Sequence, residues 1–327
     1  MSKLNMVEAL NLALSQEMAR DDRVCLMGED IGVNGGVFRV TKDLQTKFGE
    51  SRVMDTPLAE CGIVGTAVGM AVYGVRPVVE IQFSGFTMQA FDQIEQNMAR
   101  LHNRTRGKYK IPVVLRTPYG GGIRAVEHHS ESREAYWAHT PGLKVVIPSG
   151  PRNARALLAA SIREDDPVVF YEPKSVYRAF REEVPDDPEV MKIGKANIVR
   201  KGSDITLISY GAMMRPCKEA VLDLEEDRSI DVEFIDLQTV SPMDTQTLSE
   251  SVKKTGRCVI VNEGNRTCGI AAEIIARLNE CAFEFLEAPI KRITGFDIPY
   301  PYFQTEEHFV PDSNEIVMAI QETINWQ

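Results

Sequence analysis

The stretch TPLAECGIVGTAVGMAVYG, residues 56–74, decides the fold class of this chain. Glu60 precedes a run in which nearly every side chain is small, and we expect a helix over 62–73. Small residues of this kind let another backbone approach closely. The apolar run at 78–83 follows directly and predicts a buried strand. A helix that leads into a buried strand is typical of α/β proteins.

The same alternation continues along the chain on both sides of this stretch. In the first half, strand patterns occur at 24–27, 78–83, 111–116, 145–147 and 168–171, and further helical patterns at 7–18, 87–101 and 152–163. In the second half, strand patterns occur at 205–210, 232–237, 258–262 and 290–293, and helical patterns at 215–226, 245–254, 269–281 and 315–324. This alternation predicts parallel sheets that are covered by helices on both faces.

The pattern dissolves between Pro173 and Ser203, where five acids stand among two prolines. Charge clusters of this kind usually lie on solvated segments, so we expect a connector here. A chain of 327 residues is long enough for about two domains. We therefore predict an α/β protein with a first domain at 1–175, a connector at 176–202 and a second domain at 203–327.

Composition and charge exclude several classes of protein. The net charge is −10, and no basic run is present that could neutralise nucleic-acid phosphates. The longest uncharged run has 15 residues, fewer than the roughly 18 that span a bilayer. The first residues resemble neither a secretory nor a transit signal. Six scattered cysteines without a CxxC pair predict reduced thiols and a cytoplasmic location.

Common cofactor, nucleophile and metal motifs are absent from the sequence. It contains no GxGxxG after a strand, no GxxxxGK[ST] and no GxSxG. His128, His129 and His139 lie close together, but their spacing matches no standard zinc pattern.

Glu60 has two interpretations from the residues alone. An acid in the first turn of a helix is favourable by about 0.3–1 kcal/mol, whatever the protein does. Alternatively, the carboxylate lies in a tight, apolar interface, where it would be costly unless it has a partner, and then it marks a functional site.

A set of motifs, in order along the whole chain, carries a resemblance to a known family. They are LMGEDIG (26–32), TPLAECGIVGTAVG (56–69), RPVVEIQF (76–83), FDQI (91–94), HHSES (128–132), AHTPGLKVVIP (138–148), FYEPK (170–174) and IDLQTVSPMD (235–244). With these motifs the chain closely resembles the beta subunit of the thiamine-diphosphate-dependent decarboxylase component of 2-oxo acid dehydrogenase complexes. The resemblance implies an N-terminal pyrimidine-binding domain with a parallel sheet and a C-terminal α/β domain like that of transketolase.

The resemblance also implies a cofactor site at the subunit interface. In that family thiamine diphosphate binds between an alpha and a beta subunit, with its aminopyrimidine ring on the beta side. A glutamate matching Glu60 hydrogen-bonds a ring nitrogen and so promotes proton removal from the thiazolium ring. Leu58, Gln82 and Phe86 match positions that line the same pocket. On the residues alone, Phe86 could equally be a core aromatic, and Gln82 a polar residue at a strand end.

His129 matches a histidine near the thiazolium ring, which would hold the incoming lipoyl group and supply a proton. Histidine suits this task because its pKa lies near neutral. Without the resemblance, a surface loop histidine would be the simpler interpretation. His128 is the neighbour with which His129 could be confused, and the spacing to SES and AHTPGL favours His129.

Two metal ions follow from the resemblance. Relatives carry a structural potassium ion, whose ligands here would be Ile111, Val113, Ser161, Glu164 and Asp166, mostly through backbone carbonyls. An exposed acidic turn is the alternative interpretation of 164–166. Thiamine-diphosphate enzymes also hold magnesium through a GDG motif, and no GDG occurs in this chain. We therefore expect magnesium to be held by the alpha subunit, and the isolated chain to bind the coenzyme weakly or not at all.

The remaining expectations concern partners and substrate. The family forms an alpha2beta2 heterotetramer, and its C-terminal domain also docks the acyltransferase core. EIQF (80–83) and FYEPK (170–174) look more like the branched-chain branch, so we expect oxidative decarboxylation of branched-chain 2-oxo acids with acylation of the lipoyl group. Pyruvate or acetoin is the alternative substrate. Two other functions stay open: a non-catalytic assembly subunit, and an enzyme of the transketolase type that acts on sugar phosphates.

Overall fold

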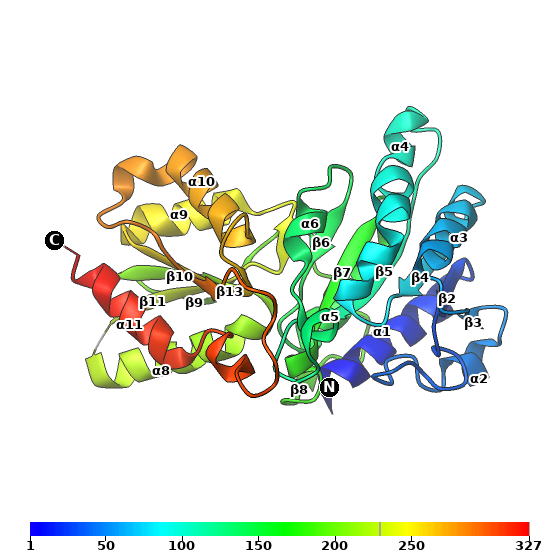
Figure 1. Cartoon of the computed structure of the whole chain (residues 1–327), viewed down its shortest axis with the longest axis horizontal. Coiled ribbons are helices and arrows are strands. Elements are labelled where there is room, and N and C mark those ends of the chain that lie inside the picture. Colours follow the sequence, from blue (N-terminus) through cyan, green and yellow to red (C-terminus); the bar gives the residue numbers. More distant parts are fainter. Residues whose placement is uncertain (229, 327) are drawn as a thin grey trace.

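The computed structural model describes residues 1–228 and 230–326, which form two α/β units that lie side by side (Figure 1). The first unit is built on a seven-stranded sheet in the order β12-β6-β7-β5-β4-β2-β3. Every neighbouring pair from β6 to β3 is parallel, and only β12 runs antiparallel. The strands are β2 (Val24–Gly28), β3 (Val53–Asp55), β4 (Arg76–Glu80), β5 (Val114–Tyr119), β6 (Lys144–Val146), β7 (Val168–Pro173) and β12 (Thr239–Ser241).

The second unit is built on a five-stranded sheet in the order β14-β13-β10-β11-β9. Its strands are β9 (Asn197–Arg200), β10 (Ile205–Ser209), β11 (Val232–Asp236), β13 (Cys258–Asn265) and β14 (Lys291–Gly295). Only β9 is antiparallel to its neighbour. A separate two-stranded sheet joins β1 (Ser2–Leu4) to β8 (Glu182–Val184).

Helices cover both faces of both sheets, as the alternating sequence pattern predicts. Figure 1 shows α9 and α10 on one side of the second sheet and α8 and α11 on the other. The helices are α1 (Met6–Arg20), α2 (Leu44–Phe48), α3 (Glu60–Val72), α4 (Leu101–Arg104), α5 (Glu127–Ser130), α6 (Glu134–Ala138), α7 (Pro151–Arg163), α8 (Met214–Arg228), α9 (Thr245–Thr255), α10 (Ile270–Ala282) and α11 (Ser313–Ile324). Capping boxes start α1 at Asn5 and α11 at Asp312.

The hydrophobic core has two layers, one on each side of the sheets. Successive strand residues point to opposite faces, so Val78 lies in the layer beneath α1 and α7, while Val79 lies in the layer beneath α3. The same alternation places Leu207 and Ile208 of β10 in different layers. Each layer extends across both sheets, and the two units therefore share their core.

The segment expected as a connector, 176–202, differs from that expectation in structure. It contains β8, which pairs with the N-terminal strand, and β9, which extends the second sheet. Only Val184 of β8 is fully buried, so the glutamates beside it hide the strand pattern in the sequence. The helix expected at 87–101 is also divided, into a 3₁₀ helix, η1 (Ser84–Ala90), a π-helix, η2 (Gln93–Met98), and α4.

Within the described residues, none of the helices is long and apolar enough to cross a membrane.

Candidate active site

The candidate site residues follow the carboxyl ends of parallel strands of the first sheet. Glu29 follows β2, Glu60 follows β3, Phe86 follows β4, His129 follows β5 and Lys174 follows β7. In open α/β sheets, ligands bind in the crevice outside these strand ends. The topology therefore gathers residues from five separate segments at one edge of the sheet.

Glu60 is the first residue of α3 and is only 8% exposed. Within the described residues, no side chain hydrogen-bonds to its carboxylate. Glu29 lies beside it, and one carboxylate oxygen of Glu29 is buried without a hydrogen-bond partner in this part of the chain. Burial, followed by the charges of Glu60, Asp30 and Glu80, raises the pKa of Glu29 to about 6. At this corner, Glu29 and Glu60 thus place carboxylate oxygens side by side that can accept hydrogen bonds from a ligand.

A buried ionic network supports this corner from within the sheet. The guanidinium of Arg116 donates to Glu172 at 2.7 and 2.9 Å and to Glu80 at 2.8 Å. The hydroxyl of Tyr177 donates to Glu172 at 2.5 Å. Burial raises the pKa of Glu172, and the charge of Arg116 opposes that rise. All four groups are nearly inaccessible to water, so their charges are satisfied only by one another.

The second part of the site is a cluster of aromatic rings around His129. Its ring centroid lies 4.4 Å from that of Phe83 and 5.3 Å from that of Phe86, edge to face in both cases. Burial, then the charges of Lys174 and His128, lowers the pKa of His129. His128 is exposed instead, with its Nδ1 3.6 Å from a carboxylate oxygen of Glu131. The structure therefore brings Phe86 and His129 together and leaves His128 at the rim.

The other predicted cofactor residues, Leu58 and Gln82, are less buried. Leu58 is 78% exposed and Gln82 is half-buried. Among the described residues, no hydrogen bond, ion pair or aromatic contact joins Glu60 to Phe86 or His129. Helix α3 nevertheless packs on η1, and η1 packs on α5, which carries His129. The two parts of the site are thus linked through η1.

One face of α3 is open to solvent. Tyr73, directly after this helix, is 92% exposed, and a Cβ added at Gly69 would meet no atom within 4 Å. Cys61 and Gly62 are exposed as well. An uncovered stripe of small and apolar residues beside the carboxylate of Glu60 is a surface that another backbone could approach closely.

The residues predicted to bind potassium lie at the opposite edge of the sheet and already have partners. The carbonyls of Ile111, Val113 and Ser161 each accept a backbone hydrogen bond, at 2.7, 2.9 and 3.3 Å. Glu164 and Asp166 both pair with the ammonium of Lys144, at 2.5 and 3.2 Å.

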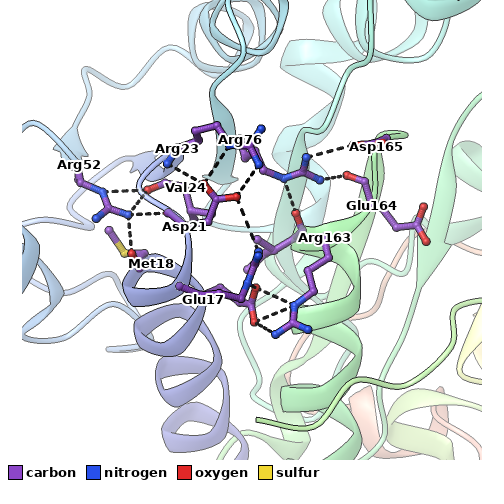
Figure 2. Close-up of polar contacts among 12 residues, drawn as sticks. Glu17, Met18, Asp21, Arg23, Val24, Arg52, Arg76, Arg163, Glu164 and Asp165 are labelled. Atoms are coloured by element: carbon purple, nitrogen blue, oxygen red, sulfur yellow. Dashed lines mark hydrogen bonds and ion pairs between the residues drawn. The ribbon is translucent and has the colours of Figure 1, made fainter.

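Figure 2 shows that a second basic side chain, Arg76, reaches the carbonyl of Glu164 and the carboxylate of Asp165. It also shows Arg163 paired with Glu17 at the end of α1. Within the described residues, no cluster of three or more His, Cys, Asp or Glu side chains could hold a metal ion. Each of these carbonyl oxygens has a second lone pair, so the observed contacts do not test a site built from carbonyls, and potassium stays a prediction from the resemblance.

Sequence reasoning missed the charged residues that support the site. Glu29, Glu172 and Lys174 stand inside the quoted motifs LMGEDIG and FYEPK, but none was assigned a role. The available signal was a charge next to an otherwise apolar strand, because such a charge must have a buried partner or a function. Their partners come from distant segments, which the sequence does not reveal.

Comparisons with known proteins agree with this geometry. The model of the transketolase pyrimidine-binding domain matches residues 2–194, and that of the transketolase C-terminal domain matches residues 194–316. A pyruvate dehydrogenase E1 component subunit beta from Staphylococcus epidermidis is 50% identical over 326 residues, which covers 100% of both chains. Its counterpart from Staphylococcus aureus is 49% identical over the same length.

A solved structure supports the fold alone. A split-gene transketolase, described as an inactive beta4 tetramer, superposes with a TM-score of 0.76 at 20% identity and covers 99% of each chain. The matched domains and the full-length relatives give the same assignment. The chain belongs to the E1 beta subunits of the thiamine-diphosphate-dependent 2-oxo acid dehydrogenases.

Proposed function

We propose that this chain supplies the beta half of the active site of a pyruvate dehydrogenase, and that it works only together with an alpha subunit. The observation that carries the proposal is the Glu60 carboxylate, which is buried, without a partner among the described side chains, and next to the open face of α3. This carboxylate is therefore available to a hydrogen-bond donor that binds beside α3.

Thiamine diphosphate fits the residues present. The unpartnered oxygen of Glu29 and the free carboxylate of Glu60 suit an aminopyrimidine, which carries N–H donors. When bound, the coenzyme supplies the electron sink that decarboxylation of a 2-oxo acid requires. Glu60 would accept a hydrogen bond from the pyrimidine and stabilise the positive charge that develops there. Phe86 would pack against the ring, and Leu58 and Gln82 would line the pocket.

His129 would hold and move a proton during acylation of the lipoyl group. Burial and the neighbouring charge of Lys174 lower its pKa, so its imidazole is neutral at pH 7. A neutral imidazole has both a donor and an acceptor nitrogen, which suits a group that first orients a thiol and then transfers a proton. Phe83 and Phe86 restrict how its ring can turn.

The missing half of the site points to the partner. Without a GDG motif, this chain lacks the usual ligands for the magnesium that accompanies the diphosphate, and we assign that ion to the alpha subunit. The open face of α3 is where the alpha subunit would dock in an alpha2beta2 heterotetramer. The C-terminal domain would bind the acyltransferase core.

Pyruvate is the substrate favoured by the relatives, because the full-length relatives at 49–50% identity are named for it. The sequence expectation was a branched-chain 2-oxo acid, based on EIQF and FYEPK. It remains the second candidate, since a pocket that differs by one or two methylenes discriminates by only about 1–3 kcal/mol.

The test is dye reduction by this chain co-expressed with its alpha subunit, with thiamine diphosphate and magnesium supplied. We expect kcat/KM to be highest for pyruvate when 3-methyl-2-oxobutanoate and 4-methyl-2-oxopentanoate are compared. A preference for either branched acid would reverse the choice of substrate and keep the reaction. Turnover of sugar phosphates, with none of 2-oxo acids, would support the transketolase-type alternative.

A variant separates catalysis from assembly. Glu60→Gln keeps the size of the side chain and removes its charge, so activity should fall at least a hundredfold while the tetramer still forms. Glu50→Gln is the matched control, because Glu50 is exposed. Full activity of Glu60→Gln would point to a chain that only tethers a partner. Calorimetry should also show little or no coenzyme binding by the isolated chain.

A further inference from the structure

The segment 120–131, which carries His129, is held from the other unit of the molecule. The segment begins directly after β5 with three consecutive glycines, and glycine does not restrict the backbone to one conformation. Within the first unit, the hydroxyl of Ser84 donates to the carbonyl of Glu131 at 2.6 Å. A Cβ added at Gly85 would collide with the carbonyl of His128, so the segment packs tightly on η1.

Two buried carboxylates of the C-terminal domain bind the beginning of this segment. Glu263 of β13 accepts a hydrogen bond from the backbone N–H of Gly121 at 3.0 Å. Glu306 accepts from the backbone N–H of Gly122, and its same oxygen lies 3.4 Å from the N–H of Arg124. Both side chains are buried, so these bonds are sheltered from competing water.

Lys174 is near both carboxylates, and it and His129 both contact the Phe83 ring. It is 4% exposed, and its ammonium has no hydrogen-bond partner within the described part of the chain. Its nitrogen is 5.8 Å from the centroid of the Phe83 ring, whose other neighbour, the His129 ring, is 4.4 Å away. The two distances add to 10.2 Å, so Lys174 lies within about 10 Å of His129. Its charge also acts on Glu263 and Glu306.

We propose that Lys174, Glu263 and Glu306 form an inter-domain latch that positions the His129 segment, which makes Lys174 and Glu306 positioning residues. The proposal takes the proposed function as given, with His129 as the group that moves a proton. The two carboxylates accept backbone hydrogen bonds best when they are ionised. A positive charge near two buried carboxylates offsets their mutual repulsion, and Lys174 supplies it.

The surroundings of the latch contain further ionisable groups. Burial lowers the pKa of Lys174 and raises the pKa of Glu263, while the opposite charges resist both changes. The other titratable or charged groups near these residues include Tyr119, Arg124, His128, Glu131, Glu134, Tyr210, Tyr300 and Glu307. Glu134 accepts a hydrogen bond of 2.9 Å from the hydroxyl of Tyr210. Lys174 is buried, and among the largest influences on the pKa of Glu263 it is the one positive charge.

Amide hydrogen exchange of the full-length chain tests the latch directly. We expect exchange in the peptide 119–131 to become about tenfold faster or more in Glu306→Ala, because two backbone donors lose their acceptor. Glu306→Gln retains an acceptor oxygen and should keep most of the protection. Lys174→Met should also speed exchange. The matched control is Lys110→Met, since Lys110 is exposed at the other edge of the sheet, where it pairs with Asp165.

The pKa of His129 gives a second measurement that does not depend on activity. The chain has five histidines, and the signal of His129 can be assigned by its loss in His129→Gln. Lys174→Met removes a positive charge within about 10 Å, so the pKa of His129 should rise by about 0.3–1.2 units for effective dielectric constants of roughly 80 to 20. An unchanged pKa would contradict an electrostatic role for Lys174.

Activity of the assembled enzyme completes the test. With pyruvate, acylation of the lipoyl domain should fall at least ten times further than dye reduction in Glu306→Ala and Lys174→Met, because the latch acts on His129. Equal loss of both reactions, or unchanged exchange in both variants, would overturn the proposal. If Lys174→Met does not fold, the difference in hydrogen exchange between Glu306→Ala and Glu306→Gln decides whether the latch exists. A wild-type enzyme inactive on every 2-oxo acid would refute the proposed function, while exchange and pKa would still decide whether the latch exists.

Discussion

Replacing Arg116 by methionine should destabilise the first domain more than any replacement of a surface ion pair. The guanidinium makes three charge-assisted hydrogen bonds of 2.7–2.9 Å to Glu172 and Glu80, all of them buried. Methionine has a similar length but leaves two carboxylates without their counter-charge. Removing one member of a buried ion pair costs about 3–5 kcal/mol. At about 2–4 °C per kcal/mol for a domain of this size, Tm should fall by about 6–20 °C.

Thermal unfolding of the full chain, followed by circular dichroism, measures this loss. Arg23→Met is the matched control, because Arg23 is exposed and its pair with Asp21 contributes at most about 1 kcal/mol. The deficit of Arg116→Met should be largest at high pH. Burial already raises the pKa of Glu172, and without Arg116 it would rise further, so the orphaned carboxyl takes up a proton as the pH falls. A Tm within about 4 °C of wild type would refute the reasoning.

Three further predictions concern stability and assembly. Glu29→Gln should raise Tm at pH 8 by about 2–4 °C. The pKa of Glu29 in the folded protein is about 6, so its ionisation destabilises the fold as the pH rises from 4.5 through 6. In melting curves recorded over a pH series, this increase in Tm should vanish below pH 4.5. Gly142→Ala should lower the free energy of unfolding by about 3 kcal/mol in urea titrations, because φ is 101° and the new Cβ would meet the carbonyl of Ala99. Gly49→Ala should lower it by only about 1 kcal/mol, because φ is 86° but no atom of the described residues lies within 4 Å of the new Cβ. Gly69→Leu should leave the Tm of the isolated chain unchanged but weaken assembly with the alpha subunit at least tenfold in sedimentation experiments, since no atom of the described residues lies within 4 Å of an added Cβ.

The fold class follows from hydrophobic patterns, because those patterns determine which faces are buried. Each predicted strand of the two sheets corresponds to an observed one, although the ends differ by a few residues, as for 111–116 against Val114–Tyr119. The pattern fails where burial is partial. In β9 most side chains are exposed, and in β8 only Val184 is buried, so no apolar run marks either strand, and both form by pairing with distant strands. The interrupted helix after Ser84 likewise reflects packing against α3 and α5 rather than local preference.

The candidate site was accessible from the sequence only in part. Glu60 and His129 could be named because motifs carry them, Phe86 could be named through the resemblance, and the structure places Phe86 and His129 in contact. Their supports could not be named, because a buried charge is explained only by a partner from another strand. Arg116 and Glu172 are 56 residues apart in sequence and neighbours in space. The hydrogen bonds that Glu306 accepts from the His129 segment span more than half of the chain and leave no local trace in the sequence.

The strand β12 has a consequence for any attempt to divide this protein. Thr239–Ser241 belongs to the second half of the sequence but forms the outer strand of the first sheet, beside β6. A fragment cut near residue 194 would therefore expose the backbone donors and acceptors of β6, together with the buried side chains Val145 and Val146. An exposed apolar edge strand can pair with a strand of another chain and so promotes aggregation. Recombination between relatives at this point would thus produce aggregating halves, and the two domains have to be inherited, expressed and engineered as one unit.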